Sequence, residues 1–135
     1  MAAHPRVSII CPTYNRSAAI APTIESVILQ TVSDWELIVV GDGCTDDTLA
    51  CVERFEDPRV RTMQIPHAGH PSPARNAGLA AANGAVVAYL DHDDRWESTH
   101  LAEVLAEFEV GATAVATGAR YVDDAGVPVA WQRSS

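Results

Sequence analysis

The chain has 135 residues, of which 47% are hydrophobic and 20% are charged, and its formal net charge is −9. This composition predicts one soluble globular domain with a sizeable core and excludes a disordered chain. All nine basic residues are arginines, and acidic residues are in excess. This excess excludes binding of nucleic acid or of an anionic membrane through a broad basic surface. Any anion must therefore be bound by backbone amides, a single arginine or a metal ion.

The first part of the chain alternates short apolar runs with helical patterns. Residues 7–11 are predicted to form a buried strand that ends at Pro12, which cannot donate to a ladder. Ser17 is predicted to cap a helix with apolar residues at helical spacing, namely Ile20, Ile24, Val27 and Ile28. Residues 36–40 are predicted to be a second strand, and residues 41–47 a polar loop. One face of the next helix is marked by Leu49, Val52 and Phe55.

The same alternation continues beyond residue 59. Strands are predicted at residues 60–65 and 85–90, with a further apolar run at 112–117. Between them, Ser72 and Pro73 are predicted to start a helix that ends at Asn83, with Gly84 as its left-handed stop. A last helix is predicted to follow a cap at Ser98 and to carry Leu101, Val104, Leu105 and Phe108. In the tail, residues 123–126 are expected to be a turn between two short extended segments.

Strands that alternate with helices in this way predict an α/β fold, with a mainly parallel sheet and helices on both faces. Ligands of such sheets bind beyond the carboxyl ends of the strands. The polar loops after the first four strands are therefore the places where a binding site is expected.

The cysteines Cys11, Cys44 and Cys51 are odd in number and form no close C-x-x-C pair. This spacing predicts neither a disulfide framework nor a structural zinc site, and a reducing cytoplasm is the expected compartment. The segment 1–6 lacks the pattern of a signal peptide, and no stretch approaches the roughly 20 apolar residues that cross a bilayer. We expect a cytoplasmic chain without a membrane span.

The strongest chemical signal is the segment 91–94, Asp-His-Asp-Asp, directly after the fourth predicted strand. Carboxylates crowded at a strand end repel one another unless a divalent cation neutralises them, and Mg²⁺ or Mn²⁺ prefers such oxygen ligands together with substrate phosphates. A solvated acidic loop that caps the next helix is the alternative interpretation of these four residues.

The other three loops each offer one polar or aromatic group. In the first loop, Tyr14 can stack on a base, and Thr13 and Asn15 can hydrogen-bond to it. In the second, Asp42 can accept hydrogen bonds from a base or a ribose. In the third, Arg75 lies in the first turn of a helix, where it can face a phosphate. Taken singly these signals are weak, and the alternatives are a tyrosine lid and ordinary turn chemistry, but all four loops share one edge of the sheet.

The order of these motifs closely resembles that of family 2 glycosyltransferases with the GT-A fold. The resemblance rests on residues 7–16, 39–48, 74–78 and 91–94 and covers the chain to about Val122. It implies a Rossmann-like nucleotide-binding half, with residues 1–122 as the donor-binding domain and residues 123–135 as a turn and tail that begin an acceptor-binding half. It also implies a nucleotide-diphosphate sugar donor, Mn²⁺ or Mg²⁺ as cofactor, and inversion at the anomeric carbon.

Carried over residue by residue, the resemblance places Tyr14 near the base and Asp42 on it, Arg75 facing the nucleotide or diphosphate, and Asp91 near the ribose or sugar. Asp93 then holds the metal together with Asp91, and Asp94 is structural. The nucleotide-sugar-binding set that the resemblance implies is Pro12, Tyr14, Asn15, Asp42, Arg75, Asp91 and His92.

Two positions depart from the family pattern, since Gly41 stands where an aspartate is frequent and Cys44 where a serine is frequent. The family's general base and acceptor-binding half lie beyond the segment after the carboxylate cluster. We therefore expect the 135 residues to bind donor and to be inactive, or only weakly hydrolytic, alone. The acceptor, whether a sugar, a lipid or a protein, is not specified.

Two other functions are open. A non-catalytic module that binds a nucleotide or a nucleotide sugar is the main alternative, and metal-dependent donor turnover separates it from an enzyme. A dinucleotide-binding oxidoreductase is disfavoured, because no G-x-G-x-x-G follows the first strand.

Overall fold

The computed structural model describes residues 5–109, 118–122 and 128–133. The chain divides into two compact units, Met1–His100 and Leu101–Ser135. The predicted boundary after residue 122 stays a prediction.

The first unit is built on a four-stranded parallel sheet with the order β3-β2-β1-β4. Its strands are β1 (Val7–Thr13), β2 (Trp35–Asp42), β3 (Val60–Ile65) and β4 (Val86–Tyr89). Every residue of β1 and β2 is buried, because these central strands are covered on both faces. The third strand has its predicted bounds, whereas β2 is longer than predicted and β4 is one residue shorter at each end.

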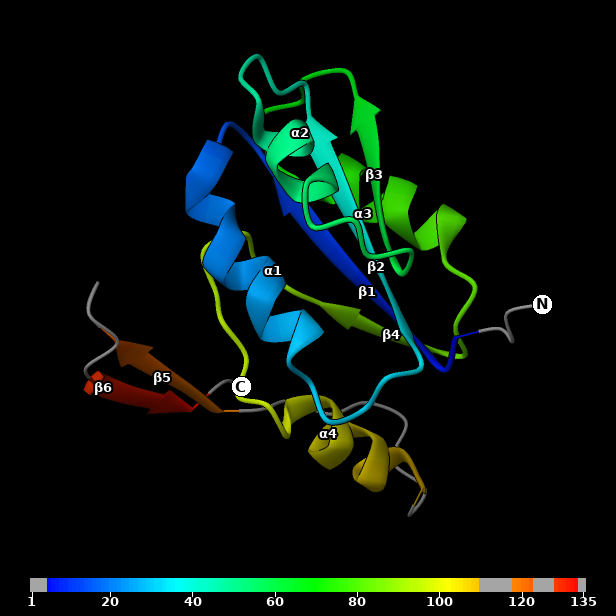
Figure 1. Ribbon diagram of the computed structural model, residues 1–135, viewed down its shortest axis with the longest axis vertical. Helices are drawn as coiled ribbons and strands as arrows, with labels where there is room; N and C mark the ends of the chain where they lie inside the picture. Colours follow the sequence, from blue (N-terminus) through cyan, green and yellow to red (C-terminus); the bar gives the residue numbers. More distant parts are fainter. Residues whose placement is uncertain (1–4, 110–117, 123–127, 134–135) are drawn as a thin grey trace. The chain divides into compact units, whose positions relative to one another are not determined.

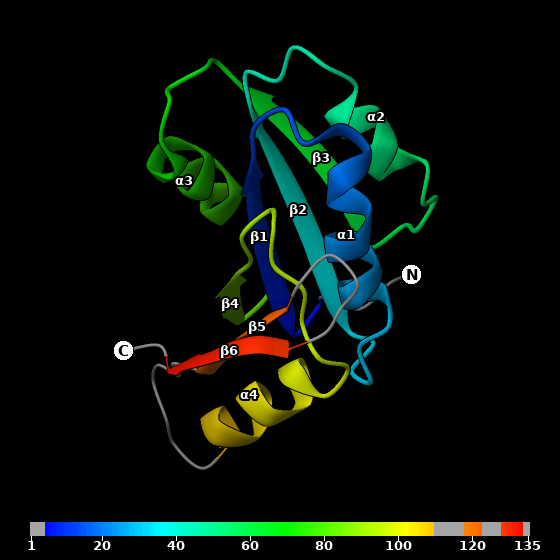
Figure 2. The same cartoon turned by 90° about the vertical axis from the view of Figure 1, so that its left-hand side faces the viewer.

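Helices cover both faces of this sheet, as predicted. They are the short 3₁₀ helix η1 (Ser17–Ile20), α1 (Ala21–Ile28), α2 (Thr48–Glu53) and α3 (Pro71–Ala81). Figures 1 and 2 show α1 and α2 on one face and α3 on the other. On the α3 face, Ala74 packs with Ile38 and Val40 of β2. Gly78 allows this close approach, because a Cβ there would lie 2.6 Å from Ile10 Cγ2.

The first strand does not stop at Pro12 as predicted but continues to Thr13, in register with Gly41 of β2. Along β1, the peptide groups of successive residues point alternately toward β2 and toward β4. Ile10 points toward β4, because its carbonyl oxygen accepts a hydrogen bond from Leu90 N just after that strand. Pro12 lies two residues further along, where its missing N–H faces the side on which the pairing with β4 has ended. The proline therefore costs no ladder bond.

The predicted helix starts are wrong at three places. Ser17 does not cap α1: it begins η1 with a positive φ of 41°, and its hydroxyl donates to Asp47 Oδ1. The third helix begins at Pro71, so its first-turn proline is Pro71 rather than Pro73. The last helix begins at His100, two residues after Ser98.

The end of α3 also differs from the prediction. The helix stops at Ala81, because the backbone N–H of Asn83 donates to Glu36 Oε2 (2.7 Å) rather than to a helix carbonyl. Gly84 is not in the left-handed conformation, since Gly43 and Gly69 are the glycines with positive φ among the described residues. A Cβ at Gly84 would lie 2.7 Å from Ser8 N, so the glycine serves the close passage of the chain past β1.

The second unit contains α4 (His100–Glu109) from Leu101 onward, and an antiparallel pair formed by β5 (Gly118–Val122) and β6 (Pro128–Arg133). This pair confirms the two extended segments predicted for the tail. The apolar run 112–117 and the turn 123–126 lie outside the described residues. No helix in the described ranges has the length and the apolar run that crossing a membrane requires.

Candidate functional site

A cavity of about 550 Å³ opens at the carboxyl ends of the parallel strands, where a binding site was predicted. All its lining residues belong to the first unit and come from the carboxyl ends of β1 and β2, from the segments that follow β1 and β4, and from the loop before α3 with the first residue of that helix. They are Pro12, Thr13, Tyr14, Asp42, His67, Gly69, His70, Pro71, Asp91, His92 and Asp93. The cavity thus brings together six of the predicted site residues, whereas Asn15 and Arg75 lie outside its lining.

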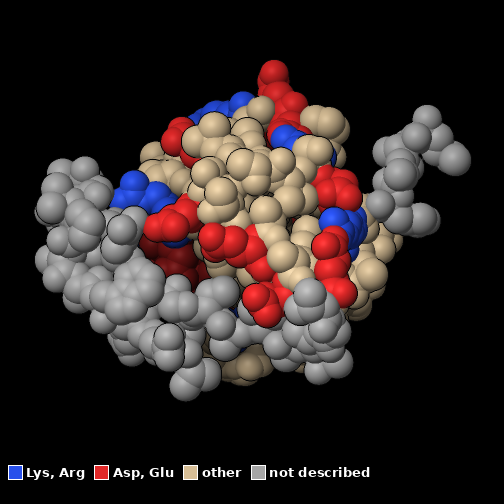
Figure 3. Space-filling model, turned by 90° about the horizontal axis from the view of Figure 1, so that it is seen from below, with Lys and Arg blue, Asp and Glu red and all other residues tan. Residues whose placement is uncertain are grey.

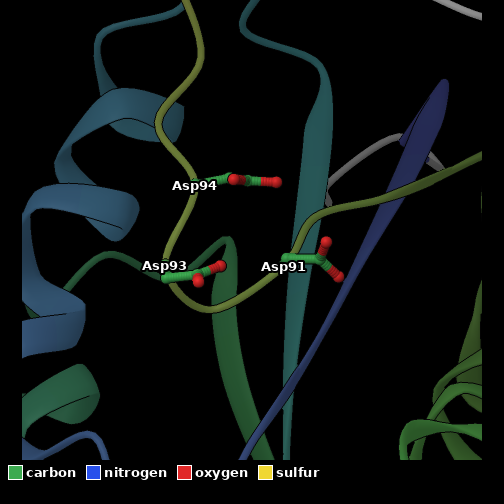
Figure 4. Close-up of side chains that lie close together, drawn as sticks. All are labelled: Asp91, Asp93 and Asp94. Atoms are coloured by element: carbon green, nitrogen blue, oxygen red, sulfur yellow. The ribbon is translucent and has the colours of Figure 1, made fainter. Parts of the chain in front are cut away.

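The acidic end of the cavity is formed by the loop after β4. Asp91, Asp93 and Asp94 each present one carboxylate oxygen, and these three oxygens lie within 4.8 Å of one another. Figure 4 shows the three side chains on one turn of the chain, directed to the same side. Partial burial, and then the charges of Asp91 and Asp93, raise the pKa of Asp94. This donor set of crowded oxygens fits a hard divalent cation such as Mg²⁺ or Mn²⁺.

Arg75 is the basic partner of this cluster. It lies in the second turn of α3 and not in the first turn as predicted, because the helix begins at Pro71. Its Nη2 is 3.3 Å from Asp91 Oδ1. The guanidinium carbon is 5.6 Å from the ring centroid of Tyr89, and the buried Nε has no hydrogen-bond partner among the described residues. The arginine therefore reaches the carboxylates from the α3 side and keeps an unused donor.

Asp42, at the last position of β2, is engaged by the loop before α3. Its Oδ1 accepts from Ala68 N (2.7 Å) and its Oδ2 from Gly69 N (3.0 Å). These bonds, led by that from the Ala68 amide, hold the pKa of Asp42 below its ordinary value despite the burial of the carboxyl. Only 9% of the side chain is exposed. The predicted base-binding aspartate thus lines the cavity and at the same time orders its wall.

Two rings form the wall beside Asp42. Tyr14 is 43% exposed, and its ring centroid is 4.6 Å from that of His67 at an interplanar angle of 36°. The predicted aromatic residue therefore faces the cavity with a histidine beside it. No role was predicted for His67.

His92 connects the loop after β4, in which it lies, with the loop after β1. Its Nδ1 is 3.2 Å from Thr13 Oγ1 and accepts a longer hydrogen bond from Tyr14 N (3.4 Å), and its carbonyl oxygen accepts from Thr23 Oγ1 (3.2 Å). Burial, and then the nearby charge of Arg16, lower the pKa of His92. A neutral imidazole in this place fixes the first loop against the loop after β4.

Asn15 faces the second loop rather than the cavity. With a φ of 47°, it donates from Nδ2 to Thr45 Oγ1 (3.0 Å) and accepts at Oδ1 from Thr45 N (2.8 Å). The buried hydroxyl oxygen of Thr48 accepts from Arg16 N (2.8 Å) and Ser17 N (2.7 Å). The second loop thus holds the strained backbone that presents Tyr14.

The two departures from the expected motif meet in space. Gly41 pairs in register with Gln64, and a Cβ on the glycine would lie only 2.2 Å from Gln64 Oε1. The same oxygen accepts from Cys44 N (3.1 Å), and Gln64 Nε2 donates to Cys44 O (3.3 Å). A glutamine amide therefore fills the space beside Gly41. This contact could not be predicted from the sequence, because it depends on the register of β2 and β3.

The surface beyond the cavity carries charges of both signs. On the face shown in Figure 3, acidic side chains lie in several groups with arginines beside some of them. That face shows no continuous basic area among the described residues.

Comparison with known proteins, by sequence and by structure, gives the family that the sequence motifs resemble. A family model described as glycosyl transferase family 2 matches residues 8–135. The Escherichia coli protein UDP-Glc:alpha-D-GlcNAc-diphosphoundecaprenol beta-1,3-glucosyltransferase WfgD is 40% identical over 95 residues, which are 70% of this chain and 38% of that protein.

Two solved structures are similar over most of the chain. S. aureus TarS in complex with UDP-GlcNAc has a TM-score of 0.74 and 30% identity, covering 78% of this chain and 31% of that one. The mannosyltransferase PcManGT from Pyrobaculum calidifontis, in complex with GDP-Man and Mn²⁺, has a TM-score of 0.72 and 25% identity, covering 89% of this chain and 36% of that one. The chain therefore spans less than half the length of each of these relatives.

Proposed function

Because the chain belongs to glycosyl transferase family 2 and has the Rossmann-like fold of its GT-A structural neighbours, we propose that it is the donor-binding part of an inverting glycosyltransferase. The donor is a nucleotide-diphosphate sugar, and the sugar passes to an acceptor hydroxyl. A non-catalytic binding module is disfavoured, because the relatives are glycosyltransferases. The cytoplasm is the proposed compartment, in keeping with the three free cysteines.

One observation carries this proposal: a carboxylate cluster and an aromatic wall line the same cavity at the carboxyl ends of the strands. A nucleotide sugar has matching parts, since its base is a flat apolar ring with polar edges and its diphosphate is an anion that a cation can bridge to carboxylates. The base is proposed to lie against Tyr14 and Asp42, and the diphosphate beside Asp91 and Asp93.

The charged residues near the proposed diphosphate position have different proposed roles. Asp93 and Asp91 are proposed to hold Mg²⁺ or Mn²⁺, which when bound stabilises the negative charge of the departing nucleoside diphosphate. Arg75 is proposed to orient Asp91 and to face the diphosphate with its guanidinium group. Pro12, Asn15 and His92 are proposed to shape the nucleotide-sugar site.

Inversion requires a base that takes the proton of the acceptor hydroxyl and a surface that orients the acceptor. No described residue of the donor cavity is assigned that role. We propose that residues 1–135 alone bind donor and at most hydrolyse it slowly.

The test is the release of nucleoside diphosphate from a panel of nucleotide sugars by the complete gene product, with and without candidate acceptors. We expect release that requires Mn²⁺ or Mg²⁺ and is lost in Asp93→Asn, a variant of nearly unchanged shape. Donor binding with no metal-dependent release in any arm of the panel would contradict the proposed enzyme and support the non-catalytic module.

A further inference from the structure

We infer that His67 reads the edge of the donor's nucleobase, with Asp42 orienting its ring, and that the site therefore prefers bases that carry an imino N–H. The inference rests on the proposed function, because it names the group that recognises the base in that same cavity. It gives a role to the one ring of the wall that the family motifs leave without one.

The orientation of the His67 ring is fixed by acceptors on one side. Its Nδ1 is 2.9 Å from the carbonyl oxygen of Asp42 and 3.3 Å from the carboxylate Oδ2 of the same residue. Both atoms accept hydrogen bonds, so Nδ1 carries the proton. The Nε2 of the neutral ring is then left with a lone pair and is an acceptor.

The backbone around His67 is held as firmly as its ring. Gly43, with a φ of +65°, packs so closely on it that a Cβ on the glycine would lie 2.6 Å from His67 Cβ and 2.7 Å from His67 N. The next two amides, of Ala68 and Gly69, donate to the Asp42 carboxylate. The histidine thus forms a preorganised part of the cavity wall, which lowers the entropic cost of binding a ligand there.

His67 lines the cavity with a side chain that is more exposed than the Asp42 carboxylate beside it. The side chain of His67 is 52% exposed, and Nε2 has no hydrogen-bond partner in the described part of the chain. The Asp42 side chain is 9% exposed, and both its oxygens already accept backbone bonds. Tyr14 lies 4.6 Å away between ring centroids and offers the base an aromatic neighbour.

This arrangement distinguishes the bases by hydrogen-bond chemistry. Uracil at N3 and guanine at N1 present an N–H in the middle of the pairing edge, and cytosine and adenine present an acceptor nitrogen there. An acceptor that meets an N–H gains a hydrogen bond, whereas two facing acceptors leave one or both unpaired. One such bond corresponds to roughly a 3- to 10-fold difference in affinity.

The experiment measures calorimetric Kd values for UDP, GDP, CDP, ADP and inorganic pyrophosphate, all with excess Mn²⁺ at one pH. The wild-type chain is compared with His67→Asn, which keeps an amide nitrogen near the place of Nδ1, and with His67→Gln, whose amide oxygen reaches toward the place of Nε2. Thermal unfolding checks that both variants fold.

We expect the wild type to bind UDP or GDP about 3- to 10-fold more tightly than CDP and ADP. His67→Asn loses this preference with its pyrophosphate affinity unchanged, and His67→Gln keeps a larger part of it. An unaltered base preference in His67→Asn, or an equal loss for every nucleotide and for pyrophosphate, would overturn the inference. Failure of the wild type to bind any nucleotide or pyrophosphate with Mn²⁺ would instead refute the proposed function.

Discussion

Replacement of Glu36 tests how the sheet holds the cavity in place from its opposite end. Glu36 lies near the start of β2, is only 7% exposed, and accepts hydrogen bonds from Ser8 Oγ (2.6 Å), Asn83 N (2.7 Å) and Arg61 Nη2 (3.1 Å). Ser8 Oγ in turn accepts from Gly84 N (2.8 Å). One carboxylate therefore ties β1, β2, β3 and the segment between α3 and β4 together.

The expected cost of Glu36→Gln follows from this set of donors. The side-chain oxygen of the glutamine replaces one oxygen of the carboxylate. The other oxygen is replaced by an NH₂ group, which cannot accept the hydrogen bonds that this oxygen accepted. Hydrogen bonds to a charged group contribute about 1.5–3 kcal/mol each, and a buried donor left unpaired costs about 1–3 kcal/mol. We expect the free energy of unfolding to fall by about 2–4 kcal/mol, a large part of the roughly 5–15 kcal/mol that is usual for a domain.

The effect should depend on pH with a definite sign. Burial raises the pKa of Glu36, but the hydrogen bonds from Ser8, Asn83 and Arg61 outweigh it and bring the folded-state pKa below the ordinary 4.5. The stabilisation is therefore complete above about pH 4.5 and is lost as the pH falls through the lower folded-state pKa.

Urea unfolding of the wild type and of Glu36→Gln from pH 3 to pH 7 measures both quantities. The gap between the two proteins should be widest near neutral pH and should narrow in acid, while nucleotide affinity of the folded variant stays unchanged. A difference below about 0.5 kcal/mol at pH 7, the scale of ordinary surface substitutions, or a gap that widens in acid, would refute this account of the network.

Three further predictions concern the cavity. Asp93→Ala should abolish metal-dependent nucleotide binding while circular dichroism stays native, and loss of folding would instead favour a structural role for the carboxylate cluster. Asp42→Ala should weaken calorimetric nucleoside-diphosphate binding by roughly 1–3 kcal/mol, because the amides of Ala68 and Gly69 lose their acceptor, and unchanged affinity would place the base elsewhere. Thr48→Val removes the hydroxyl that accepts from two first-loop amides, so hydrogen exchange of those amides should accelerate, and unchanged exchange would contradict the described contact.

The sheet and the place of the cavity could be predicted from the sequence, because buried β-branched runs such as 36–40 and 60–65 and the helices between them leave few other arrangements. The ends of the elements could not, because they depend on partners far along the chain. The end of α3 is set by the bond from Asn83 to Glu36, and β1 continues past Pro12 because its pairing with β2 goes on after its pairing with β4 has ended.

The chemical groups of the site were predictable by type, and their partners were not. The carboxylates at 91, 93 and 94 follow one another in the sequence, so their clustering needs only one turn. The engagement of Asp42 by two loop amides, and the placing of His67 beside Tyr14, require the loop before α3 to fold back over the end of β2. Backbone amides carry no sequence signal, so this part of the cavity emerges only in three dimensions.

The central claim is that the cavity binds a nucleoside diphosphate through a divalent cation, and calorimetry of UDP and GDP with the 135-residue chain tests it most directly. Two phosphates that meet Asp91, Asp93 and Asp94 without a cation face like charges, so binding should occur in excess Mn²⁺ or Mg²⁺ and disappear in a chelator. Equal affinity in the chelator and in excess Mn²⁺ would contradict the account.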